Sequence, residues 1–296
     1  MVEYNTVIIG SGIAGMSCAI YLKRAGIKTL IIEGNVVGGQ LNKSSVIENY
    51  PGYDKINGSD LAMNLYNQVN SYETDYLYEE VIDVDLKKKI VMTGNSKVKY
   101  HYLVIATGRR NRLLGLDNED KLIGSGISFC ASCDGNLYKN KSVVVIGGAN
   151  SAISEALYLS GICKKVYLIY RRDELRGENI LCDKLEDKDN IEVIYHRNVR
   201  EYLEDGGILI GVKLDDGKVI ECSCVFVAIG FVPNGELFDV DKDVGYIVVD
   251  DHYMTSVNDV YACGDIIKKS VYQLGTAVGE AVNVASEIIR DNVMKK

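Results

Sequence analysis

Cys130 and Cys133 are separated by two residues, and Asp134 follows directly. Two cysteines at this spacing can close as a disulfide and reopen as a dithiol, and the turn between them can lower the pKa of one thiol. An exchange reaction also needs a proton for the thiolate that leaves as the ring opens, and the carboxyl group of Asp134 is placed to supply it. The motif therefore predicts reversible two-electron chemistry, with Asp134 as general acid.

A Cys-x-x-Cys pair is also typical of one half of a zinc site. Cys222 and Cys224 form a second close pair that could complete a set of four sulfur ligands. These two cysteines lie in a run with strand character, where alternate residues share one face, so ordinary strand packing explains them. We therefore expect no metal, and a structural zinc or redox-sensing protein is the alternative from another functional class.

The chain begins with a pattern that would position a nucleotide. An apolar strand over residues 4–9 leads into a Gly-x-Gly-x-x-Gly turn over residues 10–15, which opens a helix, and a second strand covers residues 28–32. By itself the glycine pattern is a weak signal. Between a strand and a helix, and before a strand that ends in an acid, it predicts a dinucleotide-binding unit.

Each conspicuous residue of this pattern has a physical role. Gly10 permits a tight turn, Gly12 lets the backbone approach a pyrophosphate at the helix N-terminus, and Gly15 allows the helix to pack closely on the strand. Glu33 would accept hydrogen bonds from the hydroxyls of an adenosine ribose. The expected ligand therefore has an unphosphorylated ribose.

The same pattern returns in the middle of the chain. A strand precedes the turn over residues 147–152, and a helix and another strand follow it. Tyr170 stands at the same interval from Gly147 as Glu33 does from Gly10. This repetition predicts a second nucleotide-binding unit.

The ligand of this second unit is predicted from the basic run that replaces the acid. Arg171, Arg172 and Arg176 would bind a 2′-phosphate, which favours NADP over NAD. Ala149 stands in place of the second glycine, and its Cβ would hinder close approach of the backbone to a pyrophosphate. A unit that keeps its shape but binds no nucleotide is the alternative.

The predicted fold class is α/β, with two Rossmann-like, three-layer ββα nucleotide-binding domains. A strand that ends at Gly264 and Asp265, followed by a final helix, returns to the character of the first domain. The second domain is therefore predicted to be inserted into the first. We expect the first, discontinuous domain to cover residues 1–113 and 242–296, and the inserted domain, which carries the Cys-x-x-Cys motif, to cover residues 114–241.

Composition narrows the functional classes. The chain has 296 residues, a formal net charge of −8 and eight cysteines. The negative charge argues against general nucleic-acid binding and against an anionic membrane surface as partner. No apolar run is long enough for a membrane helix, and no basic signal-peptide head precedes the first strand. We therefore expect a cytoplasmic protein with reduced thiols, in which any disulfide is catalytic.

Two nucleotide folds in one chain, with Cys-x-x-Cys-Asp at the start of the second, closely resemble the low-molecular-weight thioredoxin reductases. The resemblance covers nearly the whole chain, and the cysteine position separates it from the larger disulfide reductases, whose pair lies in the FAD domain. The motifs that carry it are residues 10–15, 39–41, 106–108, 130–135, 147–152 and 171–176, and Gly264-Asp265 with Gln273.

The resemblance implies an electron path. Hydride would pass from NADPH to FAD, and the reduced flavin would attack the disulfide of Cys130 and Cys133, with Cys133 next to the flavin. Cys130 would then attack the disulfide of a thioredoxin or thioredoxin-like protein, and Asp134 would supply the proton. The resemblance also implies a homodimer and rotation of the inserted domain at its two linkers, because one dithiol cannot face the flavin and a protein substrate at once.

Specific residues are expected at the two nucleotide sites. The candidates for FAD are Gly10, Ser11, Gly12, Ala14, Gly15, Glu33, Gly39, Gln40, Leu41, Asn49, Ala106, Thr107, Gly108, Gly264, Asp265 and Gln273. The candidates for NADPH are Gly147, Asn150, Ser151, Ala152, Arg171, Arg172 and Arg176.

The chain departs from the family pattern at Ile13, Ala149, Tyr170 and Tyr272. Ala149 and Tyr170 bear on the electron donor, because a clostridial branch of similar flavoproteins takes electrons from ferredoxin instead of NADPH. The basic cluster of residues 109–112 would suit an acidic ferredoxin, although the net charge of −8 disfavours long-range steering of such a partner. NADPH is the favoured donor and ferredoxin the alternative. A third hypothesis is a reductase that acts on an electron carrier by flavin alone, with the cysteines as spectators.

Overall fold

A computed structural model gives the structure of the chain and describes residues 2–44 and 46–294. The fold divides into two compact units. The first contains Met1–Arg110 and Val232–Lys296, and the second contains Asn111–Phe231. The crossing segments form short paired strands, β7 (Arg109–Asn111) and β16 (Phe231–Pro233). Each unit is described separately below.

The two boundaries between the units differ from the expected ones, which lie after residue 113 and after residue 241. The larger difference is at the second boundary, where the chain has already returned to the first unit before residue 241. Phe238 is 1% exposed and belongs to the same apolar cluster as Val7 and Ile32. Burial of this ring in the first unit therefore fixes where the insertion ends.

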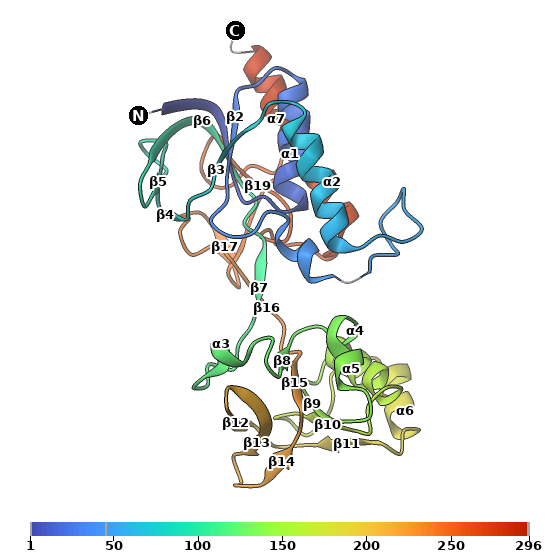
Figure 1. Cartoon of the computed structure of the whole chain (residues 1–296). Helices are drawn as coiled ribbons and strands as arrows, with labels where there is room; N and C mark the ends of the chain where they lie inside the picture. Colours follow the sequence, from blue (N-terminus) through green and yellow to red (C-terminus); the bar gives the residue numbers. More distant parts are fainter. Residues whose placement is uncertain (1, 45, 295–296) are drawn as a thin grey trace. The chain divides into compact units, whose positions relative to one another are not determined.

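The first unit is built on a twisted sheet in the order β3-β2-β1-β6-β5-β4, with β19 paired to β6 (Figure 1). Its strands are β1 (Val2–Ile9), β2 (Thr29–Ile32), β3 (Asp75–Leu77), β4 (Val81–Asp85), β5 (Ile90–Thr93), β6 (Lys97–Ile105) and β19 (Val260–Ala262), with a small hairpin of β17 (Lys242–Asp243) and β18 (Tyr246–Ile247).

The parallel strands of this sheet end together. Ile9, at the end of β1, lies beside Ile32 of β2 and Ile105 of β6, and Ile105 is paired with Ala262 of β19. The loops that follow these strands therefore emerge at one edge. This edge is where an open α/β sheet binds its ligand.

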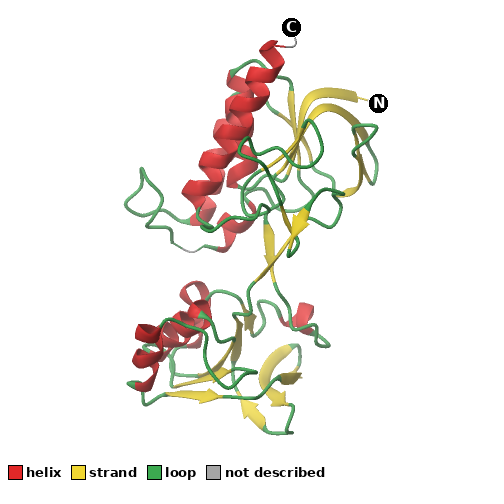
Figure 2. Ribbon diagram, turned by 180° about the vertical axis from the view of Figure 1, so that it is seen from behind, coloured by secondary structure: helices red, strands yellow, loops and turns green. Residues whose placement is uncertain are grey.

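Helices cover one face of this sheet. They are α1 (Ile13–Arg24), α2 (Gly58–Asn70) and α7 (Leu274–Met294), with a 3₁₀ turn η1 (Gly39–Lys43). α1 packs between α2 and α7 (Figures 1 and 2). Its inward side chains, such as Met16 and Leu22, are fully buried between helices and sheet. The antiparallel strands β4 and β5 extend the sheet beyond β6.

The second unit has the same architecture on a smaller scale. A sheet in the order β11-β10-β9-β15-β8 pairs in parallel throughout, and a separate antiparallel sheet has the order β12-β13-β14. The strands are β8 (Ile127–Ser128), β9 (Ser142–Ile146), β10 (Lys165–Ile169), β11 (Ile191–Ile194), β12 (Val199–Asp205), β13 (Ile208–Leu214), β14 (Val219–Glu221) and β15 (Cys224–Val227), and the helices are α3 (Glu119–Leu122), α4 (Ala131–Asp134), η2 (Gly135–Tyr138), α5 (Asn150–Ser160) and α6 (Asn179–Glu186).

Two apolar clusters lie on the faces of the parallel sheet of this unit. One joins Val144 and Val225 to side chains of the antiparallel sheet, such as Val212. The other joins Val143 and Phe226 to α5 and α6. Two sheets and a helical layer thus form a ββα sandwich. The predicted α/β class with Rossmann-like units is confirmed.

Candidate functional site

Cys130 and Cys133 form a disulfide in the second unit, with their Cα atoms 5.3 Å apart. Cys130 caps the short helix α4, and its Sγ accepts a hydrogen bond from the backbone N–H of Cys133 at 3.2 Å. Ala131, between them, is 1% exposed and packs in the apolar cluster below α5. The burial of Ala131 therefore fixes the position of the short helix, while both cysteines remain partly exposed.

The carboxyl group of Asp134 is held beside this disulfide by Ser128. The Ser128 hydroxyl donates to Oδ2 of Asp134 at 2.7 Å and accepts the backbone N–H of Cys130 at 3.1 Å. Ser128 is 5% exposed, whereas Asp134 is partly exposed, so the serine hydroxyl is buried and the carboxyl group can still be reached by water. Sequence reasoning missed Ser128, whose only signal is a polar residue at the end of a strand directly before the cysteine motif.

Cys222 and Cys224 do not share a face, so the expectation from strand alternation is wrong. β14 ends before Cys222 and β15 begins at Cys224, and the change of strand places the two thiols in different apolar clusters. Burial raises the pKa of Cys222 to about 12 and also raises that of Cys224. Among residues 2–44 and 46–294, no group of three or more His, Cys, Asp or Glu side chains is arranged to hold a metal ion. Ordinary core packing accounts for this pair.

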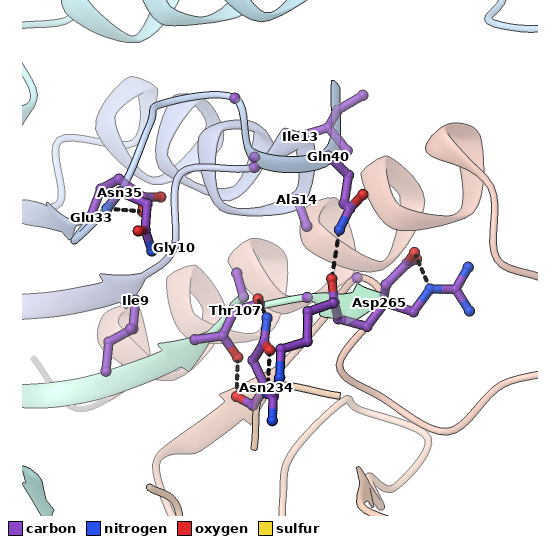
Figure 3. A pocket seen from close by; sticks show the side chains of 18 of the residues that line it. Ile9, Gly10, Ile13, Ala14, Glu33, Asn35, Gln40, Thr107, Asn234 and Asp265 are labelled. Atoms are coloured by element: carbon purple, nitrogen blue, oxygen red, sulfur yellow. Dashed lines mark hydrogen bonds and ion pairs between the residues drawn. The ribbon is translucent and has the colours of Figure 1, made fainter. Parts of the chain in front are cut away.

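A cavity of about 830 Å³ opens at the carboxyl edge of the first sheet. It is formed within the first unit by the loops that follow β1, β2, β6 and β19, together with the start of α7 (Figure 3). Its size suits an extended dinucleotide. The expected FAD residues that line it are Gly10, Gly12, Ala14, Glu33, Gly39, Gln40, Leu41, Ala106, Thr107, Gly108, Gly264, Asp265 and Gln273.

The other expected FAD residues, Ser11, Gly15 and Asn49, do not line the cavity. Ser11 is fully buried, and its backbone N–H and hydroxyl both donate to Oε2 of Glu33 at 2.8 Å. Asn49 donates from Nδ2 to Oε1 of Gln273 at 3.2 Å. Gly15 is part of the packing of α1 on the sheet. Ser11 and Asn49 can therefore contribute to the site by orienting the lining residues Glu33 and Gln273.

The glycines of the first turn are required for different reasons. Gly10 has φ +103°, and a Cβ there would lie 2.5 Å from the carbonyl oxygen of Ala106. A Cβ on Gly15 would lie 1.9 Å from the carbonyl oxygen of Gly10. A Cβ on Gly12 would meet nothing within 4 Å. Gly12 therefore faces open space at the N-terminus of α1, where a pyrophosphate would fit.

Glu33 marks one end of the cavity (Figure 3). Besides the two hydrogen bonds from Ser11, its Oε1 accepts the backbone N–H of Asn35 at 2.9 Å. The carboxylate is thereby fixed at the end of β2. This is the position from which an acid contacts an adenosine ribose in such folds.

At the opposite end of the cavity, Arg109 and Asp265 belong to a network of charged side chains that extends beyond the lining and that the sequence did not predict. Nε of Arg109 lies 3.1 Å from Oδ2 of Asp265, and its guanidinium lies 4.2 Å from the centre of the Tyr272 ring. Lys269 approaches Asp265 at 3.5 Å and Glu280 at 2.9 Å. Tyr272, a departure from the family pattern, thus provides an aromatic surface for Arg109.

Arg110 is also engaged within the first unit. Its guanidinium donates to Oδ1 of Asn234 at 2.8 Å and pairs with Glu236 at 2.7 Å. Two of the three arginines of the expected basic cluster are therefore held in internal ion pairs. This observation weakens the case for a docking patch for an acidic ferredoxin.

Asn234 and Glu280 are further residues that sequence reasoning missed. Nδ2 of Asn234 donates to the carbonyl of Thr107 at 2.9 Å, and the Thr107 hydroxyl donates to the carbonyl of Asn234 at 2.8 Å. Glu280 of α7 is 7% exposed and accepts the backbone N–H of Gly264 at 2.9 Å. Burial raises the pKa of Glu280. The sequence offered one signal for each residue: Asn234 is a polar residue directly after Pro233, and Glu280 is an acidic residue inside an apolar helix.

In the second unit, the turn over residues 147–152 resembles the first turn in the conformational class of its first and third residues. Ala149 has φ −102° and ψ 176°, and its counterpart Gly12 has φ −70° and ψ −177°. Both conformations are extended and open to any residue, so Ala149 strains nothing. Gly147 has φ +146°, and a Cβ there would lie 2.4 Å from the carbonyl oxygen of Ala228.

The side chains expected to bind NADPH are dispersed around this turn. Ala152 is fully buried in the core, whereas Ser151 is exposed at the start of α5. Asn150 exchanges hydrogen bonds with Glu178, from Nδ2 to Oε1 at 2.9 Å and from the Glu178 N–H to Oδ1 at 2.8 Å. Arg171, Arg172 and Arg176 are all exposed in the segment after β10.

These features define a class of protein with two Rossmann-like units, the second of which carries a Cys-x-x-Cys disulfide. A family model described as pyridine nucleotide-disulphide oxidoreductase matches residues 4–281. The chain belongs to this family.

Within the family, the similarity is to thioredoxin reductases. A thioredoxin reductase of Listeria monocytogenes is 38% identical over 287 residues, which cover 94% of this chain and 90% of the relative. The crystal structure of Lactococcus lactis thioredoxin reductase has a TM-score of 0.81 at 33% identity, with 98% of this chain and 99% of that chain covered. The predicted relationship to the low-molecular-weight thioredoxin reductases is confirmed, as is the predicted disulfide reductase class.

A ferredoxin-flavin thioredoxin reductase from Clostridium acetobutylicum is also similar. Its crystal structure has a TM-score of 0.56 at 27% identity, with 99% of each chain covered. Similarity to this protein is lower than similarity to the Lactococcus lactis enzyme on both measures.

Proposed function

We propose that the chain is an FAD-containing reductase that transfers electrons from NADPH to the disulfide of a thioredoxin. The observation that carries this proposal is the disulfide of Cys130 and Cys133, supported by Asp134 and Ser128, within a unit whose glycine turn has an extended residue before its helix, as the turn of the first unit does. A structural disulfide would have no use for a carboxyl group held beside it. A reversible one needs a proton there.

FAD fits the cavity of the first unit. Glu33 would hold the adenosine ribose, and the open backbone at Gly12 would face the pyrophosphate. Gln40, Asp265 and Gln273 would hold the remainder of the cofactor at the opposite end. When bound, FAD would supply the capacity to accept a hydride from a nicotinamide and to deliver its two electrons to a disulfide.

The chain's own residues would perform the exchange. Two electrons and two protons convert the disulfide of Cys130 and Cys133 into a dithiol. Cys130 then gives its proton to Asp134, and the resulting thiolate attacks one sulfur of the substrate disulfide, which forms a mixed disulfide and releases the other substrate sulfur as a thiolate. Asp134 passes that proton to this leaving thiolate. Attack by the Cys133 sulfur on Cys130 finally breaks the mixed disulfide and restores the disulfide of the chain, and the Cys133 proton goes to the second substrate sulfur, so that the substrate leaves as a dithiol.

Several features of the assembly are part of the same proposal. The partner is thioredoxin or a thioredoxin-like protein, the active form is a homodimer, and the enzyme acts in the cytoplasm. The inserted unit would rotate at its linkers so that the dithiol serves both the cofactor and the protein substrate. No helix in the described part of the chain is long and apolar enough to cross a membrane.

NADPH is the proposed donor for two reasons. Ala149 takes a backbone conformation that Gly12 also adopts, so the substitution does not distort the second turn. Arg109 and Arg110 are engaged by Asp265 and Glu236 rather than gathered for an acidic partner. The similarity to a ferredoxin-flavin enzyme makes reduced ferredoxin the alternative donor.

The proposal is tested by reduction of thioredoxin with NADPH as the source of electrons. The FAD-loaded protein should form thioredoxin thiols in a reaction that ceases in Cys130→Ser. Cys182→Ser changes a free, partly exposed cysteine elsewhere in the second unit and should leave the rate unchanged. Full activity in Cys130→Ser would show that the cysteine pair is a spectator and that the flavin acts alone.

A further inference from the structure

The two turns of the chain make corresponding contacts with the strand that follows their helix. In the first unit, Ser11, the second residue of its turn, donates two hydrogen bonds to Glu33. Gly148 is the second residue of the other turn, and it touches Tyr170. Tyr170 therefore takes the place of the ribose-binding acid, directly after β10.

The Tyr170 ring is fixed in this position. A Cβ on Gly148 would lie 2.4 to 2.6 Å from three atoms of the ring, so the absence of a side chain at Gly148 is what admits it. Tyr170 is only 5% exposed. Its backbone N–H donates to the carbonyl of Ile194 at 2.9 Å. A buried ring with fixed backbone presents its hydroxyl in one direction.

That hydroxyl is directed to Arg176. Nε of Arg176 donates to the Tyr170 hydroxyl at 2.9 Å. The backbone N–H of Arg176 donates to the carbonyl of Gly148 at 2.6 Å, and Arg176 forms a parallel bridge with Ala149. The arginine is thus attached to the turn through both its backbone and its side chain, although it lies in an otherwise exposed segment.

We propose that Tyr170 is a positioning residue that orients the Arg176 guanidinium toward the 2′-phosphate of a nucleotide bound at the second turn. This inference rests on the proposed use of NADPH. An arginine binds phosphate best when its planar fork is already oriented, because less side-chain entropy is then lost on binding. Glu33 favours a free ribose in the first unit, and the Tyr170 and Arg176 pair favours a 2′-phosphorylated one in the second.

Calorimetric titration of the FAD-loaded protein with 2′,5′-ADP and with 5′-AMP tests this role. Tyr170→Phe keeps the ring and removes the hydroxyl, and should weaken 2′,5′-ADP binding about tenfold, the effect of one lost hydrogen bond to a charged group. Binding of 5′-AMP should not change. Gly148→Ala should weaken the binding of 2′,5′-ADP in the same way, because the added Cβ would displace the Tyr170 ring.

Matched controls separate this role from general damage. Tyr158→Phe removes another hydroxyl, from an exposed residue of α5, and Arg200→Ala removes an exposed arginine of β12. Neither should alter the preference between the two ligands. Arg176→Ala should lower the preference at least as much as Tyr170→Phe, with Arg171 and Arg172 retaining the remainder, and Tyr170→Phe should then have no further effect when added to it.

The outcomes distinguish the inference from the proposed function. Equal affinity of wild type and Tyr170→Phe for 2′,5′-ADP would overturn the role of Tyr170 and leave NADPH as the donor. A parallel loss of both ligands in Tyr170→Phe would also overturn it, because the effect would be structural. Failure of the wild-type protein to bind 2′,5′-ADP would overturn both the inference and the proposed donor.

Discussion

Asp134 is the residue whose proposed role depends most on its surroundings. Its carboxyl group is held by Ser128, which also contacts the backbone of Cys130. We expect Asp134→Asn to lower the rate of thioredoxin reduction about 100-fold, because general acid catalysis contributes factors of this order. Reduction of the bound flavin by NADPH should remain as fast as in wild type. Stopped-flow absorbance separates the two steps, and an equal loss in both would contradict the assignment.

Ser128→Ala provides the matched comparison. It leaves the carboxyl group in place and removes only the hydroxyl that orients it. We therefore expect a smaller loss of thioredoxin reduction than in Asp134→Asn. A larger loss than in Asp134→Asn would show that Ser128 acts by itself rather than through Asp134.

Glu155 of α5 carries a predicted dependence of stability on pH. Burial raises the pKa of Glu155 to about 7, and its Oε2 has no hydrogen-bond partner among the described residues. Because the folded-state pKa lies above the unfolded value, the stability associated with the neutral carboxyl is present below about pH 4.5 and is lost as the pH rises toward 7.

Unfolding in urea at pH 5 and pH 8 checks this dependence. Relative to Glu155→Gln, the free energy of unfolding of the wild-type protein should fall by on the order of 2 kcal/mol from pH 5 to pH 8. Glu221→Gln changes an exposed residue of β14, and its free energy of unfolding should depend on pH in the same way as that of the wild type. An unchanged difference between wild type and Glu155→Gln across this range would contradict the assignment.

At the scale of elements, α1 depends on the glycines of its turn to different degrees. Gly15→Ala would place a Cβ 1.9 Å from the backbone of Gly10 and force α1 away from β1. We expect this variant to lose most of its FAD and to unfold at a clearly lower temperature. Gly12→Ala meets no protein atom and should keep the unfolding temperature of the apoprotein while binding FAD more weakly. Equal unfolding temperatures for the two apoproteins would contradict this distinction.

The sequence predicted the elements whose residues repeat with a regular spacing. The turns at Gly10 and Gly147, their flanking strands and the Cys-x-x-Cys motif are local patterns that can be read along the chain. Residues brought together from distant segments could not be found in this way. Asn234 meets Thr107 across the insertion, and Tyr272 meets Arg109, through contacts that arise only when the sheet is assembled.

The cysteines of residues 222–224 show a second limit of sequence reasoning. Alternation predicts a common face only while a strand continues, and here one strand ends and another begins between the two thiols. The boundary of the inserted unit was displaced for a related reason. Burial of Phe238 against residues far away in the sequence, and not a local turn, determines where the first unit resumes.

At the scale of the whole molecule, the sequence of one Rossmann-like unit is inserted into the sequence of another. The two turns have different partners at the end of the second strand, a carboxylate at Glu33 and the Tyr170 and Arg176 pair in the inserted unit. This difference is the physical basis for expecting two different nucleotides.

The most direct test of this account is an anaerobic mixture of the oxidised, FAD-loaded protein with NADPH, followed by flavin absorbance. We expect rapid bleaching by NADPH and much slower bleaching by NADH, because the arginines of the second unit favour a 2′-phosphate. A flavin that NADPH leaves oxidised, and that reduced ferredoxin then bleaches, would contradict the account and identify the donor as a protein.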